Sequence, residues 1–497
     1  MKTLITILFA RIVKKRNNSW ISNPLETQNK TFNRLLKKGM NTKFGVDHNF
    51  TSINNYDDFQ NQVPIRDYEA LKPYIDKVVA GEKNILWPGQ PLYFAKTSGT
   101  TSGAKYIPIT KESIRTHVNS ARDALLNYFL KTKNYRPING KHMFLQGSPR
   151  LDKKNGVFIG RLSGISAHYI PKFFLNNRVP SWNTNCIEDW EKKVDTIIKE
   201  TVGEKMMIIA GIPSWVQMYF EKIVSNENKT INEVFPDLTL YVYGGVSYEP
   251  YKSTFDKLFG KKVDTLATYP ASEGFFGYQY SFTEERTDLL LLLNNDIFYE
   301  FIKAEDFLRG DYKRITLKDV EINVNYLLII STSAGLWGYN IGDTIKFTST
   351  KPYKIIVSGR IKHFLSAFGE HVIAEEVENS MKIATKDHGV TIREFTVAPN
   401  INPKEGLPCH EWYIEFETQP KDINAFSKTL ESEMLNQNIY YKDLIHGRII
   451  KPLKVISVKK GGFNEYMKSV GRLGGQNKVP RLSNDRKIVD KLNTYYS

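Results

Sequence analysis

Residues 97–105 read Thr97-Ser98-Gly99-Thr100-Thr101-Ser102-Gly103-Ala104-Lys105. One apolar run precedes this stretch at 92–95 and another follows it at 106–109, so the pattern predicts a tight loop that joins two β-strands. The glycines allow the backbone to approach a ligand closely, the hydroxyls can donate and accept hydrogen bonds, and the lysine adds a positive charge. These are the components of a phosphate-binding loop.

The spacing within this loop differs from that of the common nucleotide-triphosphatase loop. That motif has four residues between its glycines and ends in Gly-Lys-Ser/Thr, whereas three residues separate Gly99 from Gly103 here and Tyr106 follows the lysine. The loop therefore indicates a different nucleotide chemistry or, taken alone, an ordinary hairpin turn of small residues.

The composition is that of a large globular protein. The 497 residues, 41% of them hydrophobic, are ample for buried cores in more than one domain. An apolar run at 4–10 is too short to span a membrane and leads directly into basic residues, which predicts an amphipathic first helix. Cys186 and Cys409 are the only cysteines, which excludes a disulfide framework. We therefore expect a cytoplasmic protein with no membrane partner.

The charge balance raises the possibility of nucleic-acid binding. The net charge is +16, from 69 basic and 53 acidic residues. The basic residues are spread along the chain, however, and the densest groups, at 11–16 and 459–460, are short. A solvated basic surface that attracts anionic small molecules is favoured over a nucleic-acid partner.

Strand and helix patterns alternate through the first two-thirds of the chain. Helices are predicted at 1–50, at 111–130 with Ile114, Val118, Ala121, Leu125 and Phe129 on the apolar face, and at 190–201 and 213–224. Strands are predicted at 143–145, 206–210, 240–243, 263–267 and 327–330. The last three of these strands lead into loops of small and polar residues. Because ligands in open α/β sheets lie beyond the carboxyl ends of strands, we expect these loops to face one crevice.

The pattern changes near Gly359-Arg360. Beyond that point the sequence predicts a small α+β domain with an open-faced sheet. Its helices are predicted at 372–384 and 423–435, and its strands at 391–398, 412–416 and 448–458. The fold class is therefore α/β, with a large N-terminal domain of several subdomains, residues 1–359, and a smaller α+β domain, residues 360–497.

Four segments together resemble the nucleotide motifs and hinge of the acyl-adenylate-forming, firefly luciferase-like superfamily. In chain order they are residues 97–105, Tyr269-Pro270-Ala271-Ser272-Glu273, Tyr339-Asn340-Ile341-Gly342-Asp343 and Gly359-Arg360. Within that superfamily the chain is similar, over nearly its full length, to the auxin-responsive acyl acid amido synthetase family of plants and its bacterial relatives. Segments outside these motifs add to the likeness: Asn23-Pro24 with Gln28, residues 42–45, Gly140-Lys141 and residues 160–164.

The resemblance implies an ATP- and Mg²⁺-dependent ligase. Such an enzyme converts a carboxylic acid to an acyl-adenylate, releases pyrophosphate, and transfers the acyl group to an amine, commonly an amino acid, with release of AMP. Residues 1–359 would bind ATP and the acyl acid, and residues 360–497 would form a mobile lid. The first alternative is a ligase that uses a thiol acceptor such as coenzyme A. The second alternative is a basic nucleic-acid-binding protein in which the loop at 97–105 is merely structural.

The resemblance also implies roles for individual residues. The triphosphate would be lined by Thr97, Ser98, Thr100 and Thr101, with Lys105 nearby. The adenine and α-phosphate would be bordered by Gly245, Val246, Thr268, Tyr269 and Ser272. The remaining roles are Mg²⁺ binding by Glu273, ribose binding by Asp343 and Arg360, and contact with the α-phosphate by Lys478 during adenylation.

Each of these motifs also has an ordinary interpretation. Alone, Ser272-Glu273 predicts a helix N-terminus, Gly342-Asp343 a turn, and Lys478 a solvated side chain in a glycine-rich loop. Their shared order beside the opening loop favours a nucleotide site. Asn340 stands where the family pattern usually has arginine, so the contact of that arginine is in doubt here.

Overall fold

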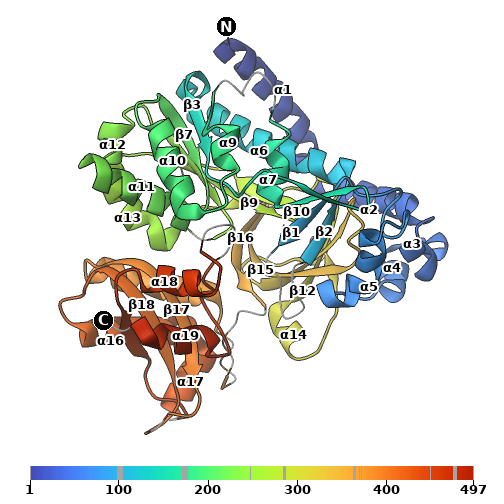
Figure 1. Cartoon of the computed structure of the whole chain (residues 1–497). Coiled ribbons are helices and arrows are strands. Elements are labelled where there is room, and N and C mark those ends of the chain that lie inside the picture. The colour runs from blue at the N-terminus through green and yellow to red at the C-terminus, as the bar shows by residue number, and fades with distance from the viewer. Residues whose placement is uncertain are drawn as a thin grey trace. The chain divides into compact units, whose positions relative to one another are not determined.

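The computed structural model describes residues 2–97, 105–170, 177–246, 248–283, 287–361, 365, 367–368, 370, 372–403, 405–447, 449–473 and 478–495. The chain forms two compact units (Figure 1). Unit 1 consists of Met1–Val246 and Val263–Ile356, and unit 2 consists of Ser247–Lys262 and Val357–Ser497.

Unit 1 contains a twelve-stranded sheet and a four-stranded sheet among its described residues. The strand order in the large sheet is β13-β12-β14-β15-β16-β11-β10-β9-β8-β7-β3-β6, and that in the small sheet is β2-β1-β5-β4. In chain order the strands are β1 (Tyr93–Thr97), β2 (Lys105–Ile109), β3 (Lys141–Phe144), β4 (Asp152–Lys154), β5 (Val157–Gly160), β6 (Arg178–Val179), β7 (Met206–Ala210), β8 (Leu240–Gly244), β9 (Asp264–Ala271), β10 (Gly274–Gln279), β11 (Leu289–Leu291), β12 (Ile297–Lys303), β13 (Ile315–Thr316), β14 (Asn325–Thr332), β15 (Tyr339–Thr350) and β16 (Tyr353–Arg360).

Five neighbouring strands of the large sheet are parallel. Strands β6, β3, β7, β8 and β9 run in the same direction. The helices along this stretch of the chain are α7 (Leu162–Ala167), α9 (Trp182–Asn185), α10 (Trp190–Thr201), α11 (Pro213–Glu227) and α12 (Ile231–Val234). The carboxyl ends of these strands therefore meet at one edge of the sheet, as expected for the loops after the strands predicted at 240–243 and 263–267. The third strand of that expectation, at 327–330, lies in β14, which is not one of the parallel strands and pairs in antiparallel fashion with β12 and β15.

The bounds predicted for β7 and α10 are confirmed. β7 is apolar throughout, as expected for a strand of a parallel sheet that is covered on both faces. α10 begins after Asp189, whose side chain accepts a hydrogen bond from the Lys192 amide at 2.8 Å. This is an N-cap, which satisfies one of the amides that a helix leaves unpaired at its start.

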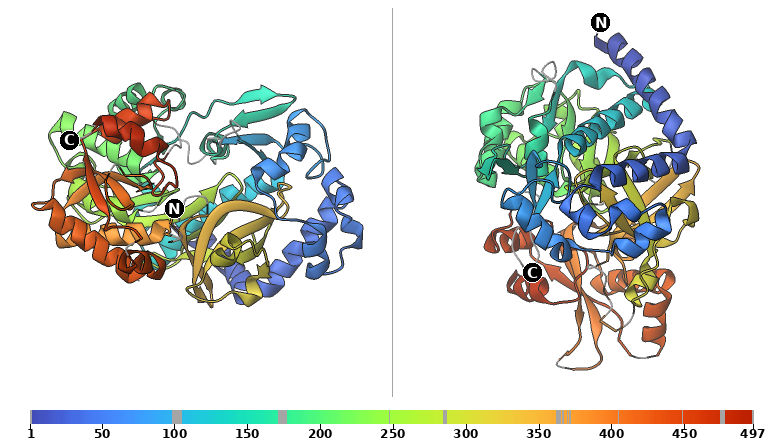
Figure 2. Two further views of the ribbon diagram at one scale, coloured as in Figure 1. Left: turned by 90° about the horizontal axis from the view of Figure 1, so that it is seen from below. Right: turned by 90° about the vertical axis from the view of Figure 1, so that its right-hand side faces the viewer.

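The N-terminal helices gather at one side of unit 1 (Figure 2, blue). They are α1 (Lys2–Ser22), α2 (Pro24–Gly39), α3 (Lys43–Asp47), α4 (Tyr56–Gln62) and α5 (Tyr68–Val79). Gln28 of α2 is 3% exposed and joins this group to β12. Its Nε2 donates to the carbonyls of Leu293 and Ile297, at 2.9 and 3.0 Å, and its Oε1 accepts from the Tyr299 amide at 2.9 Å. The glutamine therefore bonds to the backbone of β12 at residues that pair with β14 but not with β13.

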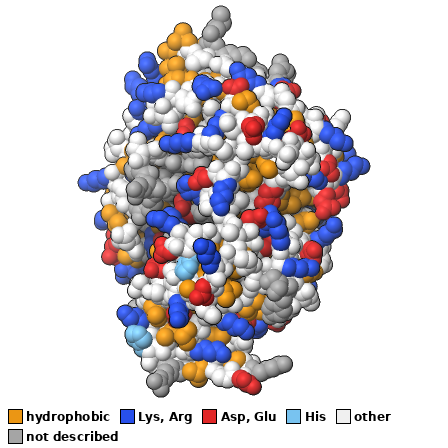
Figure 3. Space-filling model, turned by 90° about the vertical axis from the view of Figure 1, so that its left-hand side faces the viewer, with side chains coloured by type: hydrophobic (Ala, Val, Ile, Leu, Met, Phe, Trp, Pro, Cys, Tyr) orange, Lys and Arg blue, Asp and Glu red, His pale blue; other side chains and the backbone are white. Residues whose placement is uncertain are grey.

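Helix α1 is apolar on two faces rather than one. Ala10, Val13 and Trp20 are buried, whereas the outward side chains of Leu4, Ile5, Leu8 and Ile12 are exposed. Figure 3 shows hydrophobic atoms at the top of the molecule. Over the rest of that face Lys and Arg side chains alternate with Asp and Glu, so no extended patch of a single charge forms there.

Helix α6 (Lys111–Thr132) lies where it is predicted, but its buried face differs. Ala121 is exposed and Leu125 is half-buried, while His117, Ser120 and Asp123 are buried. Two of these polar side chains have distant partners: Ser120 accepts a hydrogen bond from Asn295 at 2.7 Å, and Asp123 pairs with Arg16 at 2.7 Å. His117 Nε2 is buried without a hydrogen-bond partner among the described residues. A pattern of apolar residues cannot identify a buried face on which polar groups are satisfied by distant residues.

The start of α6 offers a test of its anchoring. Thr110 Oγ1 accepts from the Ser113 amide at 3.1 Å and donates to the Ser333 carbonyl at 2.8 Å. Thr110→Ala is expected to lower the free energy of unfolding by about 1–2 kcal/mol, because the helix loses its cap and a buried carbonyl loses its donor. Urea denaturation followed by circular dichroism measures this. Thr132→Ala, the same change at the far end of α6, should cost less than half as much, and equal losses would refute the capping role.

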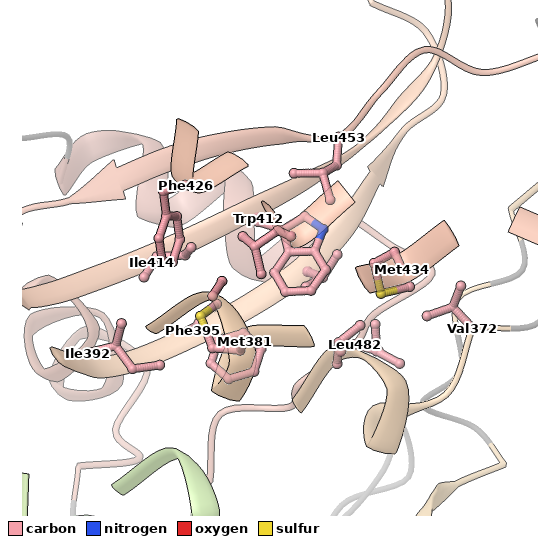
Figure 4. Close-up of a cluster of buried hydrophobic side chains, with 14 of the residues drawn as sticks. Val372, Met381, Ile392, Phe395, Trp412, Ile414, Phe426, Met434, Leu453 and Leu482 are labelled. Atoms are coloured by element: carbon pink, nitrogen blue, oxygen red, sulfur yellow. The ribbon is translucent and has the colours of Figure 1, made fainter. Parts of the chain in front are cut away.

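Unit 2 is an α+β structure around a three-stranded sheet. The sheet order is β17-β18-β19, formed by β17 (Thr391–Asn400), β18 (Cys409–Thr418) and β19 (Lys454–Val458). Helices α15 (Ala374–Asp387), α16 (Ile423–Gln437) and α17 (Ile439–His446) pack over one face, where Trp412, Ile414 and Phe426 belong to the core (Figure 4). The unit also contains α13 (Glu249–Phe259), whereas α14 (Ala304–Leu308) belongs to unit 1.

The prediction of an open-faced sheet in this region is wrong. Side chains of a strand alternate between faces, so Tyr413 points away from Trp412 and Ile414. It packs in a second cluster with Phe463 of α18 (Gly462–Ser469) and Val489 of α19 (Lys487–Leu492). β19 also begins at Lys454 rather than near 448, since Pro452 has no amide hydrogen to donate to a sheet.

Candidate nucleotide-binding site

Two paired strands hold the ends of the glycine- and hydroxyl-rich loop. β1 and β2 are antiparallel, and Thr97 is the partner of Lys105 in their register. The prediction that this stretch joins two strands is confirmed. Residues 98–104, which include Ser98, Thr100 and Thr101, lie outside the described residues, so their contacts with a triphosphate stay predictions.

Lys105 is held at the base of this loop by a tyrosine that the sequence did not single out. Its Nζ lies 5.2 Å from the centroid of the Tyr68 ring, and the Tyr68 hydroxyl accepts from the Tyr106 amide at 2.9 Å. Burial raises the pKa of Tyr68, so the phenol is neutral and its ring faces the ammonium group. A cation over an aromatic face in this way is stabilised without losing its charge.

The ends of β8 and β9 lie against each other without space for a side chain. A Cβ on Gly244 would lie 2.7 Å from the carbonyl oxygen of Thr268, its partner in the β8–β9 register. Thr268 Oγ1 donates to the Tyr243 carbonyl at 2.8 Å, so this hydroxyl joins the two strand ends. Gly245 follows with φ +85° and is exposed, and Val246 is half-buried. The backbone at Gly245 is thus accessible to a flat ligand.

Ser272 and Glu273 form the turn of a β-hairpin. β9 pairs with β10 in antiparallel fashion, and Ala271 is the partner of Gly274. The alternative of a helix N-terminus at Ser272-Glu273 is therefore wrong, because both flanking segments are extended and paired. Ser272 is buried and Glu273 is half-buried at the carboxyl end of β9. This turn places a carboxylate at the edge of the sheet where the nucleotide is expected.

Asp343 accepts a hydrogen bond from a residue of another predicted motif. The Tyr269 hydroxyl donates to Asp343 Oδ2 at 2.7 Å, although the strands β9 and β15 are not neighbours in the sheet. The ring of Tyr269 is fixed by Phe276, with the centroids 5.0 Å apart. The structure thus joins two of the motifs, and an ionised carboxylate retains acceptor sites beyond the one that a single donor occupies.

Asn340 creates the local backbone that presents Asp343. The register of β14 and β15 shifts between the pairs Ile329–Asn340 and Leu327–Thr344, which marks a bulge. Gly342 has φ +83° within it, and its amide donates to Asn340 Oδ1 at 2.8 Å. Asparagine suits this position because its short amide closes a turn with its own backbone.

Two predicted site residues belong to unit 2. Arg360 is exposed at the end of β16, and Lys478 is exposed after the segment 474–477, which lies outside the described residues. Thr97, Lys105, Gly245, Val246, Thr268, Tyr269, Ser272, Glu273 and Asp343 belong to unit 1.

The arrangement of acidic residues suits a Mg²⁺ ion that is bound jointly by the protein and by substrate phosphates, rather than one that is bound by protein side chains alone. No group of three or more His, Cys, Asp or Glu side chains among the described residues could hold a metal ion. Mg²⁺ is commonly held by one or two carboxylates together with substrate phosphates, which Glu273 at a strand end can provide. No helix within the described ranges is both long and apolar enough to cross a membrane.

Comparison with protein families gives matches along most of the chain. The GH3 family N-terminal domain matches residues 13–185, its central domain residues 290–360 and its C-terminal domain residues 375–487. A jasmonoyl–L-amino acid synthetase, JAR4 of Nicotiana attenuata, is 22% identical over 91% of this chain and 90% of its own length. A probable indole-3-acetic acid-amido synthetase, GH3.1 of Arabidopsis thaliana, is 21% identical over 93% of this chain and 89% of its own length.

Solved structures share the fold. The GH3.15 acyl acid amido synthetase superposes with a TM-score of 0.81 at 16% identity, covering 98% of this chain and 96% of its own. A 2-hydroxyisobutyryl-CoA ligase in its postadenylation state gives a TM-score of 0.57 at 12% identity, covering 97% and 92%. The predicted fold class, a large α/β domain with a smaller α+β domain, is confirmed by both likenesses.

Proposed function

The chain belongs to the GH3 family, and from that premise we propose that it is an ATP-dependent acyl acid amido synthetase. In the first half-reaction a carboxylate oxygen of the acyl acid attacks the α-phosphorus of ATP and pyrophosphate leaves. In the second, an amine nitrogen, in our proposal that of an amino acid, attacks the acyl carbon, loses a proton, and AMP leaves. The Tyr269–Asp343 hydrogen bond is the observation that supports this most directly, because it links two nucleotide motifs in one structure.

The chain's own residues would position and stabilise the reacting groups. Asp343, oriented by Tyr269 and by the bulge at Gly342, would accept hydrogen bonds from the ribose hydroxyls. Lys105 and the loop that it closes would neutralise the triphosphate, and Glu273 would hold Mg²⁺. Bound Mg²⁺ supplies positive charge to the phosphates. The location that we propose is cytoplasmic, with small-molecule substrates and no nucleic-acid partner.

We propose that residues 360–497 act as a lid that brings Arg360 and Lys478 to the nucleotide during adenylation, while residues 1–359 hold the substrates. The whole of 360–497 belongs to one compact unit, which supports its movement as a body.

Lys478→Ala is expected to reduce acid-dependent ATP–pyrophosphate exchange by about 100-fold, because a preorganised donor stabilises the charge that develops on the α-phosphate. Amide formation from added acyl-adenylate should keep the wild-type rate, since that step forms no new phosphate bond. Lys491→Ala, which changes an exposed lysine of α19, is the matched control for both assays. Unchanged exchange in Lys478→Ala would remove this lysine from the mechanism.

An exchange screen over aromatic and aliphatic carboxylic acids tests the proposed function itself. Products formed with amino acids and with coenzyme A then distinguish an amide-forming ligase from a thioester-forming one. Exchange that responds to no acid, together with salt-sensitive binding to DNA or RNA, would refute the proposal in favour of a nucleic-acid-binding protein.

A further inference from the structure

Three cationic side chains converge on the segment that follows β3. Lys193 of α10 donates from Nζ to the Gln146 carbonyl at 2.8 Å. Arg178, in β6, lies 2.7 Å from the Gln146 side-chain amide, whose oxygen accepts from the guanidinium when the amide is oriented to satisfy both of its neighbours. Arg161 is the residue before the first turn of α7, without a side-chain capping bond, and it lies over Gly147, where an added Cβ would be 3.0 Å from its Cδ. We call Arg161, Arg178 and Lys193 the β3 cation cluster.

The β3 cation cluster contacts neutral groups within the described part of the chain. Lys193 is 2% exposed, and its second acceptor is the Asn185 carbonyl at 2.8 Å. The Arg178 guanidinium lies 6.0 Å from the ring centroid of Trp182. The side chain of Arg161 makes no hydrogen bond or ion pair with any described residue; its backbone carbonyl accepts from the Ile165 amide at 2.9 Å. Burial lowers the pKa of both arginines, and it lowers the pKa of Lys193 to about 8.

Two arginines whose side chains are almost fully buried are paired with carboxylates. Arg481 of unit 2 contacts Glu378 at 3.2 Å and also Glu394, and Arg314 of unit 1 lies 3.1 Å from Glu300. Withdrawing a cation from water without an anion is costly, so these pairs are the expected arrangement. The β3 cation cluster departs from it, which indicates that its anion comes from outside the chain.

The location of the cluster suits a substrate rather than the nucleotide. Gln146 lies beyond the carboxyl end of β3, at the sheet edge where Gly245 and Ser272 follow β8 and β9. Neighbouring strands are about 4.8 Å apart, so β3, two strands from β8 and three from β9, ends roughly 10–14 Å from the proposed adenine position. Planar guanidinium groups bind carboxylates through two parallel hydrogen bonds.

We propose that Arg161, supported by Arg178 and Lys193, binds a carboxylate that does not react. This inference rests on the proposed function, and the carboxylate has two sources there. It belongs either to the amino acid acceptor, as its α-carboxylate, or to the acyl acid, as a second carboxylate at its far end. In both cases the site selects substrates by a charge remote from the bond that forms.

The test compares charged and neutral substrates in Arg161→Met. If the acceptor is the source, kcat/KM for an amino acid falls by about 30-fold or more, while that for the corresponding amino acid amide changes less than threefold. If the acyl acid is the source, Arg161→Met loses about 30-fold or more in ATP–pyrophosphate exchange with a dicarboxylic acid, while its exchange with the monoester of that acid changes less than threefold. Arg161→Lys, which retains the positive charge but cannot form two parallel hydrogen bonds, should recover part of the loss. Arg150→Met, an exposed arginine on the preceding loop, is the control.

The outcomes separate this inference from the proposed function. If ATP–pyrophosphate exchange by the wild-type enzyme responds to none of the carboxylic acids, the proposed function is refuted. Wild-type exchange with equal activity of Arg161→Met on every charged and neutral substrate refutes the carboxylate site alone. Equal losses on charged and neutral substrates also refute it, because they indicate a structural role. If Arg161→Met does not fold, judged by circular dichroism, Arg161→Lys and Arg161→Gln undergo the same comparison.

Discussion

Asp343→Ala is expected to lose about 1,000-fold in acid-dependent ATP–pyrophosphate exchange, because each hydrogen bond from a ribose hydroxyl to a carboxylate contributes about 1.5–3 kcal/mol. The loss should appear mainly when ATP is varied rather than the acid, since the acid does not contact this carboxylate in the proposed site. Steady-state exchange at varied ATP measures it.

Tyr269→Phe is the companion variant. It keeps the Asp343 carboxylate and removes only the hydroxyl that donates to it at 2.7 Å. The expected loss is about tenfold, because the carboxylate remains but is less well oriented. An Asp343→Ala enzyme that retains more than a tenth of wild-type exchange, with an unchanged melting temperature, would exclude ribose binding by this residue.

Arg314→Met is expected to lower the free energy of unfolding by about 3–5 kcal/mol, the largest effect on stability that we predict, since it leaves a buried carboxylate without its cation. Glu300 and Arg314 are 0% and 4% exposed and lie 3.1 Å apart. The arginine also donates to the carbonyls of Gln60 and Val63, at 2.7 and 2.8 Å, so it ties the end of α4 to β12. Urea denaturation followed by circular dichroism measures the loss.

The pH dependence of this variant distinguishes lost charge pairing from lost packing. Burial raises the pKa of Glu300, against the opposing effects of Arg314 and the Tyr56 hydroxyl, and removing Arg314 raises it further. A carboxyl whose pKa is higher in the folded state binds its proton more tightly there, so stability is retained at low pH and lost as the pH rises through the folded pKa. Arg314→Met should therefore be closer to wild type at pH 5 than at pH 8.

The double variant Glu300→Gln/Arg314→Met is the control for this effect. It has no buried carboxylate, so it should recover part of the stability and lose the extra pH dependence. A deficit in Arg314→Met that is the same at both pH values would show that packing, rather than the unpaired charge, accounts for the loss.

The sequence was informative where structure depends on neighbours in the chain. The apolar run at 206–210 and the helical pattern at 190–201 are local signals, and β7 and α10 lie where they predict. The order of the motifs also indicated the nucleotide site, including Tyr269 and Asp343. That bond spans 74 residues, and no local pattern specifies it.

The features that the sequence did not predict depend on distant partners. Gln28 resembled a family spacer, yet its function in the fold is to pair the backbone of β12, more than 260 residues away. The polar buried face of α6 depends on Asn295 and Arg16 in the same way. Ser272-Glu273 has the composition of both a helix start and a hairpin turn, and only the pairing of β9 with β10 distinguishes them.

The division of the chain into units gives α13 an unusual topological position. This helix lies between β8 and β9 in the chain, both of unit 1, but it packs with unit 2, where Tyr251 contacts Glu394 and Lys382 lies 2.8 Å from Glu249. The polypeptide therefore passes from one unit to the other three times. If the chain ended at residue 356, α13 would lose the unit 2 residues that it packs against. Residues 357–497 therefore do not form an independent domain without α13. The chain connects α13 to the end of β8 and to the start of β9, so a displacement of unit 2 is transmitted to these two strands through the backbone. The first of these connections begins immediately after Gly245 and Val246.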